Sequence, residues 1–208
     1  ELTEFNKELT KVDDAGNITE LGFGALDSSG GMFPNWLTAW GIKIFDDANS
    51  KFVFTQPESI ELVEWLVQME KMNDPAKTGA FYNTYPQWGS VVPGGAFSSG
   101  KEAMIVDGSW APGGLKEITP DGEFGYTWVP NKKGLKSQQM GAHQFGINKT
   151  SEGAQRDGIW KFIEFIATEG NDLIYHSTGS FAYSKSFAAT VKTDEFPGLQ
   201  WYFDSVAE

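Results

Sequence analysis

The sequence predicts an α/β fold in which helices flank a mixed sheet. Apolar residues recur at helical spacing in several stretches, and short apolar runs typical of strands lie between them. The two patterns alternate along all 208 residues without an internal repeat, which favours an α/β sheet over a sandwich. Hydrophobic residues make up 40% of the chain and charged residues 21%, so the composition is globular. A chain of this length can bury a core as one large domain or two small ones.

The first part of the chain opens with Leu2, Phe5 and Leu9 at helical spacing. Glycine, proline and aspartate then separate the periodic stretches and mark the turns between them. In order, the expected elements are a helix over 2–9, a turn at 13–17, a strand over 21–25, a loop at 27–31, a helix over 33–40 ended by Gly41, a hairpin of 42–45 and 52–54, and a helix from Pro57 to Met72 capped by Thr55.

The second part begins with residues 73–100, which are rich in glycine and proline and lack clear periodicity. Because four aromatic residues interrupt this stretch, we expect an ordered loop region rather than a linker. The further expected elements are a strand over 101–107, a helix from Ser109 interrupted at Pro112-Gly113-Gly114, strands over 124–129 and 145–147, a helix from its cap at Ser151 to Ile166 that ends before Gly170, and a helix over 171–177.

Charge and composition exclude several classes of function. The net charge is −12 and the basic residues are scattered, whereas nucleic-acid binding requires a clustered basic face. The absence of cysteine excludes disulfides, thiolate nucleophiles and cysteine-ligated zinc. No apolar run approaches the roughly 18 residues needed to cross a bilayer, so no membrane insertion of this chain is expected. The sequence starts within a helical pattern and without Met, and we expect it to be a piece of a longer protein.

Catalytic and metal sites are not expected. The acidic residues of 13–20 lack the spacing of a calcium-binding loop, and Asp46 and Asp47 are adjacent strand residues that point to opposite faces. A glycosidase needs two carboxylates that converge on one bond. His143 and His176 have no serine in a nucleophile elbow to complete a triad. We therefore expect no enzyme activity, no metal ion and no cofactor.

Tryptophan residues are the strongest indication of a binding site. Trp110 follows a strand pattern and the sharp turn permitted by Gly108, which places an indole at the carboxyl end of a strand. An indole offers a broad apolar face that matches the C–H face of a sugar ring. A cap over the core is the alternative role for Trp110. Four tryptophans occupy loops or element ends, where exposed rings favour recognition, namely Trp36, Trp40, Trp88 and Trp110, whereas Trp65 and Trp160 fall on helical apolar faces.

Four segments carry a family resemblance, in matching order and spacing over essentially the whole chain. They are Phe5 to Lys11 with the following 12–23, Phe97 to Met104, Met104 to Trp110, and Phe124 to Pro130. In these segments the chain resembles the extracellular solute-binding proteins of ABC importers, in the carbohydrate-binding family that includes maltose-binding protein. The segment 178–185 is also similar, although it lacks the usual proline.

The resemblance implies a periplasmic-binding-protein-like (type II) fold of two α/β lobes with the ligand in the cleft between them. Residues 1–140 and 185–208 correspond to the C-terminal lobe, and 141–184 resemble the returning part of the N-terminal lobe, most of which would be missing. The helix from Ser151 to Thr168 would then lack the sheet it normally covers. We expect residues 145–180 to fold back over the remaining lobe or to pack against a second copy.

The resemblance also implies the function and the site. The chain would bind a mono- or oligosaccharide without catalysis and deliver it to ABC permease subunits, outside the cytoplasm, either in the periplasm or at the surface as a lipoprotein. A glycoside hydrolase and a structural or partner-binding domain remain the alternatives. Trp110 matches the stacking tryptophan of the family, and we expect it to be partly exposed in a concavity shared with Phe33 or His143. The remaining site residues implied by the resemblance are Asn35, Trp36, Asp107, Gln144 and Trp201.

Overall fold

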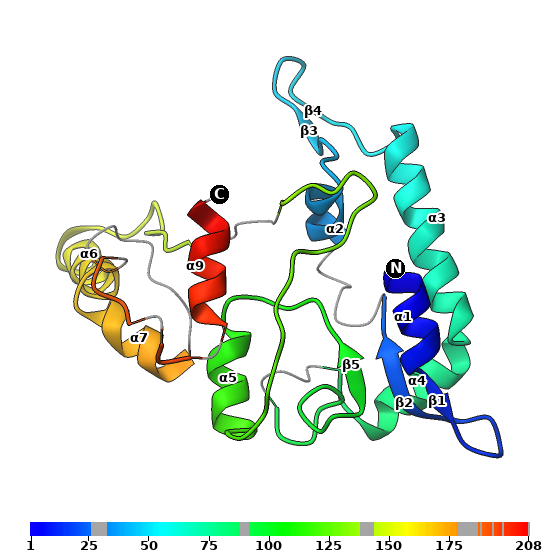
Figure 1. Cartoon of the computed structure of the whole chain (residues 1–208). Coiled ribbons are helices and arrows are strands. Elements are labelled where there is room, and N and C mark those ends of the chain that lie inside the picture. Colours follow the sequence, from blue (N-terminus) through cyan, green and yellow to red (C-terminus); the bar gives the residue numbers. More distant parts are fainter. Residues whose placement is uncertain are drawn as a thin grey trace. The chain divides into compact units, whose positions relative to one another are not determined.

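The protein is described by a computed structural model of residues 1–25, 33–87, 92–137, 144–178, 187, 189–192, 194–196 and 198–207 (Figure 1). The chain divides into two compact units. Unit 1 comprises residues 1–107 and 127–140, and unit 2 comprises residues 108–126 and 141–208. Like the lobe boundary implied by the resemblance, this division separates residue 140 from residue 141. Unlike that boundary, it groups 108–126 and 185–208 with the segment 141–184. The correspondence of these segments to the lobes of a larger protein stays a prediction.

Unit 1 contains a three-stranded mixed sheet, which confirms the expected α/β class. The central strand β2 pairs with β1 in antiparallel orientation and with β5 in parallel orientation. A separate two-stranded antiparallel hairpin joins β3 and β4. The elements are α1 (Leu2–Leu9), β1 (Lys11–Val12), β2 (Ile18–Phe23), α2 (Phe33–Ala39), β3 (Phe45–Asp46), β4 (Lys51–Phe52), α3 (Pro57–Met72), α4 (Pro75–Thr84) and β5 (Glu102–Met104).

A close contact joins α1 to β2. A Cβ atom at Gly22 would lie 2.4 Å from the carbonyl oxygen of Asn6, so only glycine allows this approach. The fully buried Asn6 accepts a hydrogen bond from the Phe23 N–H at 2.9 Å through its side-chain oxygen. The same oxygen accepts from the Asn73 amide at 3.2 Å. Because Asn73 follows α3, these bonds connect α1, β2 and the end of α3.

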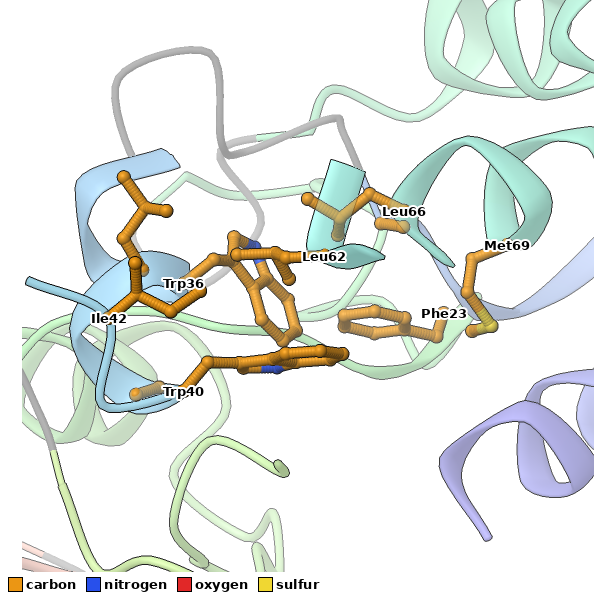
Figure 2. Packing of buried hydrophobic residues seen from close by; sticks show 10 residues of the cluster. Phe23, Trp36, Trp40, Ile42, Leu62, Leu66 and Met69 are labelled. Atoms are coloured by element: carbon orange, nitrogen blue, oxygen red, sulfur yellow. The ribbon is translucent and has the colours of Figure 1, made fainter. Parts of the chain in front are cut away.

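The main core of unit 1 lies where α2, α3 and β2 meet (Figure 2). On α3, Leu62, Leu66 and Met69 recur at helical spacing and are almost fully buried. Trp36 of α2 meets Phe23 edge-on, with 6.2 Å between ring centroids. Full burial of each large apolar side chain stabilises the fold by about 1.5 to 3 kcal/mol.

The secondary structure of unit 1 differs from expectation within residues 73–100, at the start of α3 and over 101–107. Residues 73–100 contain α4, because the Asp74 side chain accepts a hydrogen bond from the Ala76 N–H at 3.0 Å and Pro75 opens the first turn. Gln56, rather than Thr55, is the N-cap residue of α3. The strand expected over 101–107 is confined to residues 102–104, which pair with β2.

The described part of unit 2 consists of helices and connecting segments. Its helices are α5 (Ala111–Ile118), α6 (Gly153–Ala167), α7 (Gly170–Thr178) and α9 (Leu199–Ala207). Tyr175 of α7 packs against Phe196 and Leu199 in a small buried cluster. The sequence did not predict α9. The strands expected over 124–129 and 145–147 do not form in the described structure, where neither segment has a neighbouring strand to pair with.

Helix α6 leaves its largest side chains in solvent. Trp160 is 59% exposed and Phe162 is 57% exposed, and among the fifteen residues of α6, all of which are described, none is buried. The folding back of residues 145–180 over the remaining lobe and their packing against a second copy both stay predictions. Among the described residues, no helix has the length and apolar character needed to span a membrane.

Candidate functional site

Trp110 lies at the turn between β5 and α5, directly before the first residue of α5. Its ring packs over the backbone of Gly108, where a Cβ atom would lie 2.3 Å from two ring carbons. The indole is 39% exposed, so it is neither a core residue nor a fully solvated one. This partial exposure agrees with the expectation for Trp110, and its role as a ligand contact stays a prediction.

Trp201 lies on α9 and is half-buried. Its ring stacks with that of Tyr126, at 6.4 Å between ring centroids and an angle of 27° between ring planes. Burial raises the pKa of the Tyr126 hydroxyl above its ordinary value, which keeps this side chain uncharged. Sequence reasoning did not single out Tyr126, because its aromatic partner lies on a helix 75 positions later in the chain.

The site residues predicted on α2 lie in or beside the core of unit 1. Phe33 is half-buried and packs against the core cluster, and Asn35 is half-buried. The expectation that Trp36 is an exposed indole was wrong, since it is 1% exposed. The ring makes edge contacts with Phe23 and Trp65 (Figure 2 shows the first of these). The short helix α2 therefore turns its tryptophan into the protein.

The remaining predicted positions lie on connecting segments. Asp107 is exposed and is the last residue before the chain enters unit 2, and Gln144 is exposed in unit 2. His143 and Trp88 lie outside the described residues. The concavity expected between Trp110 and Phe33 or His143 thus stays a prediction. For predicted site residues in unit 2, the structure shows the Trp110 ring over Gly108 and the Trp201 ring on Tyr126.

Acidic residues that the sequence raised as metal or catalytic candidates hold turns. Asp13 accepts hydrogen bonds from the backbone N–H groups of Ala15 and Asn17 and from the Asn17 side chain, and these bonds lower the pKa of its carboxyl. A side-chain hydrogen bond from Asn49 similarly lowers the pKa of Asp46. In the described ranges of the chain, no three acidic or histidine side chains are placed to hold a metal ion.

A hollow of about 490 Å³ on unit 2 brings polar groups together around His176. The Nδ1 atom of His176 lies 2.7 Å from a Glu195 carboxylate oxygen, and Nε2 lies 3.4 Å from an Asp172 oxygen. The nearby Tyr175 hydroxyl donates to the Lys192 carbonyl at 3.0 Å, and burial together with the charge of Glu195 raises its pKa to about 12. At neutral pH this hydroxyl is therefore protonated.

Comparison with known proteins shows the family and the fold. Residues 1–199 match the family model described as bacterial extracellular solute-binding protein. The structures of CpMnBP1 with mannobiose bound and with mannotriose bound each superpose with a TM-score of 0.78 at 18% identity, over 100% of this chain and 52% of theirs. The chain therefore spans about half the length of these structures. No curated protein matches it. The chain belongs to the bacterial extracellular solute-binding protein family, which makes it an extracytoplasmic protein.

Proposed function

We propose that this chain is part of a non-enzymatic solute-binding protein that captures a carbohydrate and delivers it to an ABC permease. The observation that carries the proposal is the half-exposed indole of Trp110 at the turn after β5, in a chain that belongs to a solute-binding family. An aromatic ring face can stack on the C–H face of a sugar, and the polar side chains at the same turns can bind hydroxyl groups.

The class of sugar is chosen from the structural comparison. Both similar structures hold manno-oligosaccharides, so mannobiose and mannotriose are the first ligands to test. Because the identity is 18%, the likeness supports the fold of this chain, and the sugar class is our inference. Asp107 and Gln144 are exposed and polar, which suits each of them to a hydrogen bond with a sugar hydroxyl group.

Transport would require a change of conformation on binding. In this mechanism a sugar favours the closed arrangement of two lobes, because it contacts both lobes only when they are closed. The permease would then recognise the closed form. Residues 1–140 and 185–208 would supply one lobe and 141–184 part of the other, and the protein would reside in the periplasm or be anchored at the surface as a lipoprotein.

Several residues that the two alternative functions would use are engaged in other contacts. A glycoside hydrolase needs an isolated pair of convergent carboxylates, but Asp46 is held in a hairpin turn by Asn49 and Asp47 lies 3.8 Å from the Lys43 ammonium. A partner-binding domain would bury Trp36, Trp40 and Trp110 in a protein interface. The Trp36 and Trp40 indoles instead pack in the core of unit 1, and only Trp110 of the three is exposed.

Calorimetric titration of the full-length protein with mannobiose, mannotriose and a wider saccharide panel tests the proposal. We expect saturable binding, and Trp110→Ala should weaken it by at least about 1 kcal/mol, which is roughly fivefold in affinity. Trp160→Ala is the matched control, because it removes a more exposed indole that lies on α6. Equal affinities for the wild-type and Trp110→Ala proteins would reject the stacking role, and no binding to any saccharide would reject the proposed function.

A further inference from the structure

The aromatic pair of Trp201 and Tyr126 joins two distant parts of the sequence within unit 2. A separation of 6.4 Å between ring centroids and an angle of 27° between ring planes lie within the range of offset stacking. Both side chains are half-buried, so the stack covers part of each ring and leaves part of each accessible. The contact therefore belongs to the surface of unit 2 rather than to its interior.

Gly198 fixes the position of the tyrosine ring in this pair. Its φ angle is +82°, and a Cβ atom at this residue would lie between 2.2 and 2.5 Å from three carbons of the Tyr126 ring. The ring thus packs directly on the backbone at the start of α9, and no other amino acid fits there without displacing it. The Gly198 carbonyl accepts a hydrogen bond from the Tyr202 N–H at 3.1 Å, which joins this backbone to the first turn of α9.

The start of α9 is itself held by buried neighbours. Leu199 is 1% exposed and packs in the cluster of Tyr175 and Phe196, which connects α9 with α7. On the other side of the stack, Tyr126 is the last residue of unit 2 before the chain continues into unit 1 at Thr127. The backbone at Gly198 thus holds Tyr126 against the start of α9.

We infer that Tyr126 is a positioning residue, which with Gly198 holds the Trp201 indole in the orientation that presents its exposed part to a saccharide. The inference rests on the proposed function, because it takes Trp201 as a ligand contact. A tryptophan on a surface helix samples several rotamers, and each one that does not face the ligand lowers the affinity. Stacking on a fixed aromatic ring removes these alternatives before the sugar binds.

The test compares Tyr126→Leu with Tyr126→Phe in the full-length protein, using mannotriose or the tightest ligand of the saccharide panel. Leucine keeps apolar bulk but cannot stack, and it should weaken binding by about three- to tenfold. Phenylalanine keeps the ring and should restore the affinity to within about twofold. Tyr85→Leu is the matched control, because Tyr85 is a half-buried tyrosine that packs on Phe81 in unit 1 and should lower thermal stability without changing affinity.

A second measurement needs no ligand. The fluorescence of Trp201 is obtained as the difference between the protein and its Trp201→Phe variant, first with Tyr126 present and then in the Tyr126→Leu background. Loss of the stack should expose the indole further and shift this difference spectrum to longer wavelength. Tyr126→Phe should leave the emission wavelength of the Trp201 difference spectrum unchanged.

The two measurements separate failure of the inference from failure of the proposed function. If no saccharide binds the wild-type protein, the proposed function fails, and the difference spectrum still reports whether Tyr126 fixes the indole. If a saccharide binds and Tyr126→Leu retains wild-type affinity, the inference is overturned. An unchanged Trp201 spectrum in Tyr126→Leu overturns it as well, because the tyrosine then does not hold the indole.

Discussion

Helices α3 and α6 are similar in length, at sixteen and fifteen residues, and both carry large apolar side chains on more than one face. Helix α3 buries Leu62, Leu66 and Met69 against α2 and β2, whereas no side chain of α6 reaches full burial in the part of the chain that the structure describes. A helix that is apolar around most of its circumference is typical of one surrounded by other elements. Apolar content thus shows that a helix is suited to burial. Whether the helix is buried depends on which other elements pack against it.

Leu62→Ala should produce the largest loss of stability, because this side chain is fully buried at the centre of the α3 face. Removing it creates a cavity, and we expect the free energy of unfolding to fall by about 2 to 5 kcal/mol. Urea denaturation followed by circular dichroism measures this change. A loss below about 1 kcal/mol would show that unit 1 is no better packed than α6, and the contrast between the two helices would disappear.

Asn73→Ala removes the amide that bonds the buried side chain of Asn6. Because an unsatisfied buried polar group costs about 1 to 3 kcal/mol, the free energy of unfolding should fall by that amount. Asn83→Ala on α4 is the matched control, since Asn83 is exposed. Equal effects of the two substitutions in urea denaturation would mean that the amide bridge adds no stability to unit 1.

Phe162→Ser on α6 should change the stability of the single chain by less than about 0.5 kcal/mol, because the phenylalanine is already exposed. If a second copy covers α6, the same substitution should convert a dimer to a monomer in light scattering. A large destabilisation of a monomeric chain would contradict the exposed position of this side chain. The result would show whether α6 is left uncovered, or is covered by a second copy as α3 is covered by its own chain.

Acid should weaken the β1–β2 turn. Hydrogen bonds from Asn17 lower the pKa of Asp13, and the Lys11 ammonium lowers the pKa of Glu20. A lowered pKa means that the carboxylates stabilise the fold above their ordinary pKa values, and that this contribution is lost as the pH falls below about 4. Hydrogen exchange should rise at residues 11–20 in that window. Asp13→Asn should remove part of this acid response, and an unchanged response would contradict the assignment.

The sequence predicted the α/β class and most of unit 1, because the helices there have clear apolar periodicity. It missed α4, whose helical content depends on the Asp74 cap and on burial of Thr78 and Phe81, against a sequence that contains Gly79. Strands over 124–129 and 145–147 were expected from apolar runs alone. A strand also needs a partner, and the described structure places none beside these runs.

The candidate site was predictable only where it depends on local sequence. The turn at Gly108 presents Trp110 as expected, because the glycine and the indole are two positions apart. Trp36 was assigned to the surface from its place on a short helix, but contacts with Phe23 and Trp65 bury it. The stack of Tyr126 beneath Trp201 depends on a tertiary contact that no local pattern indicates.

The parallel pairing of β2 with β5 has a consequence for synthesis of the protein. Leu21 pairs with Glu102 and Phe23 with Met104. One edge of β2 therefore stays unpaired until β5 is translated, about 80 residues later. At about 5 to 20 residues per second, the ribosome needs roughly 4 to 16 seconds to deliver it. During that interval a nascent strand with buried, apolar Leu21 and Phe23 presents open hydrogen-bonding groups to other chains. The sheet of unit 1 is therefore most vulnerable to mispairing before residue 104 has been made.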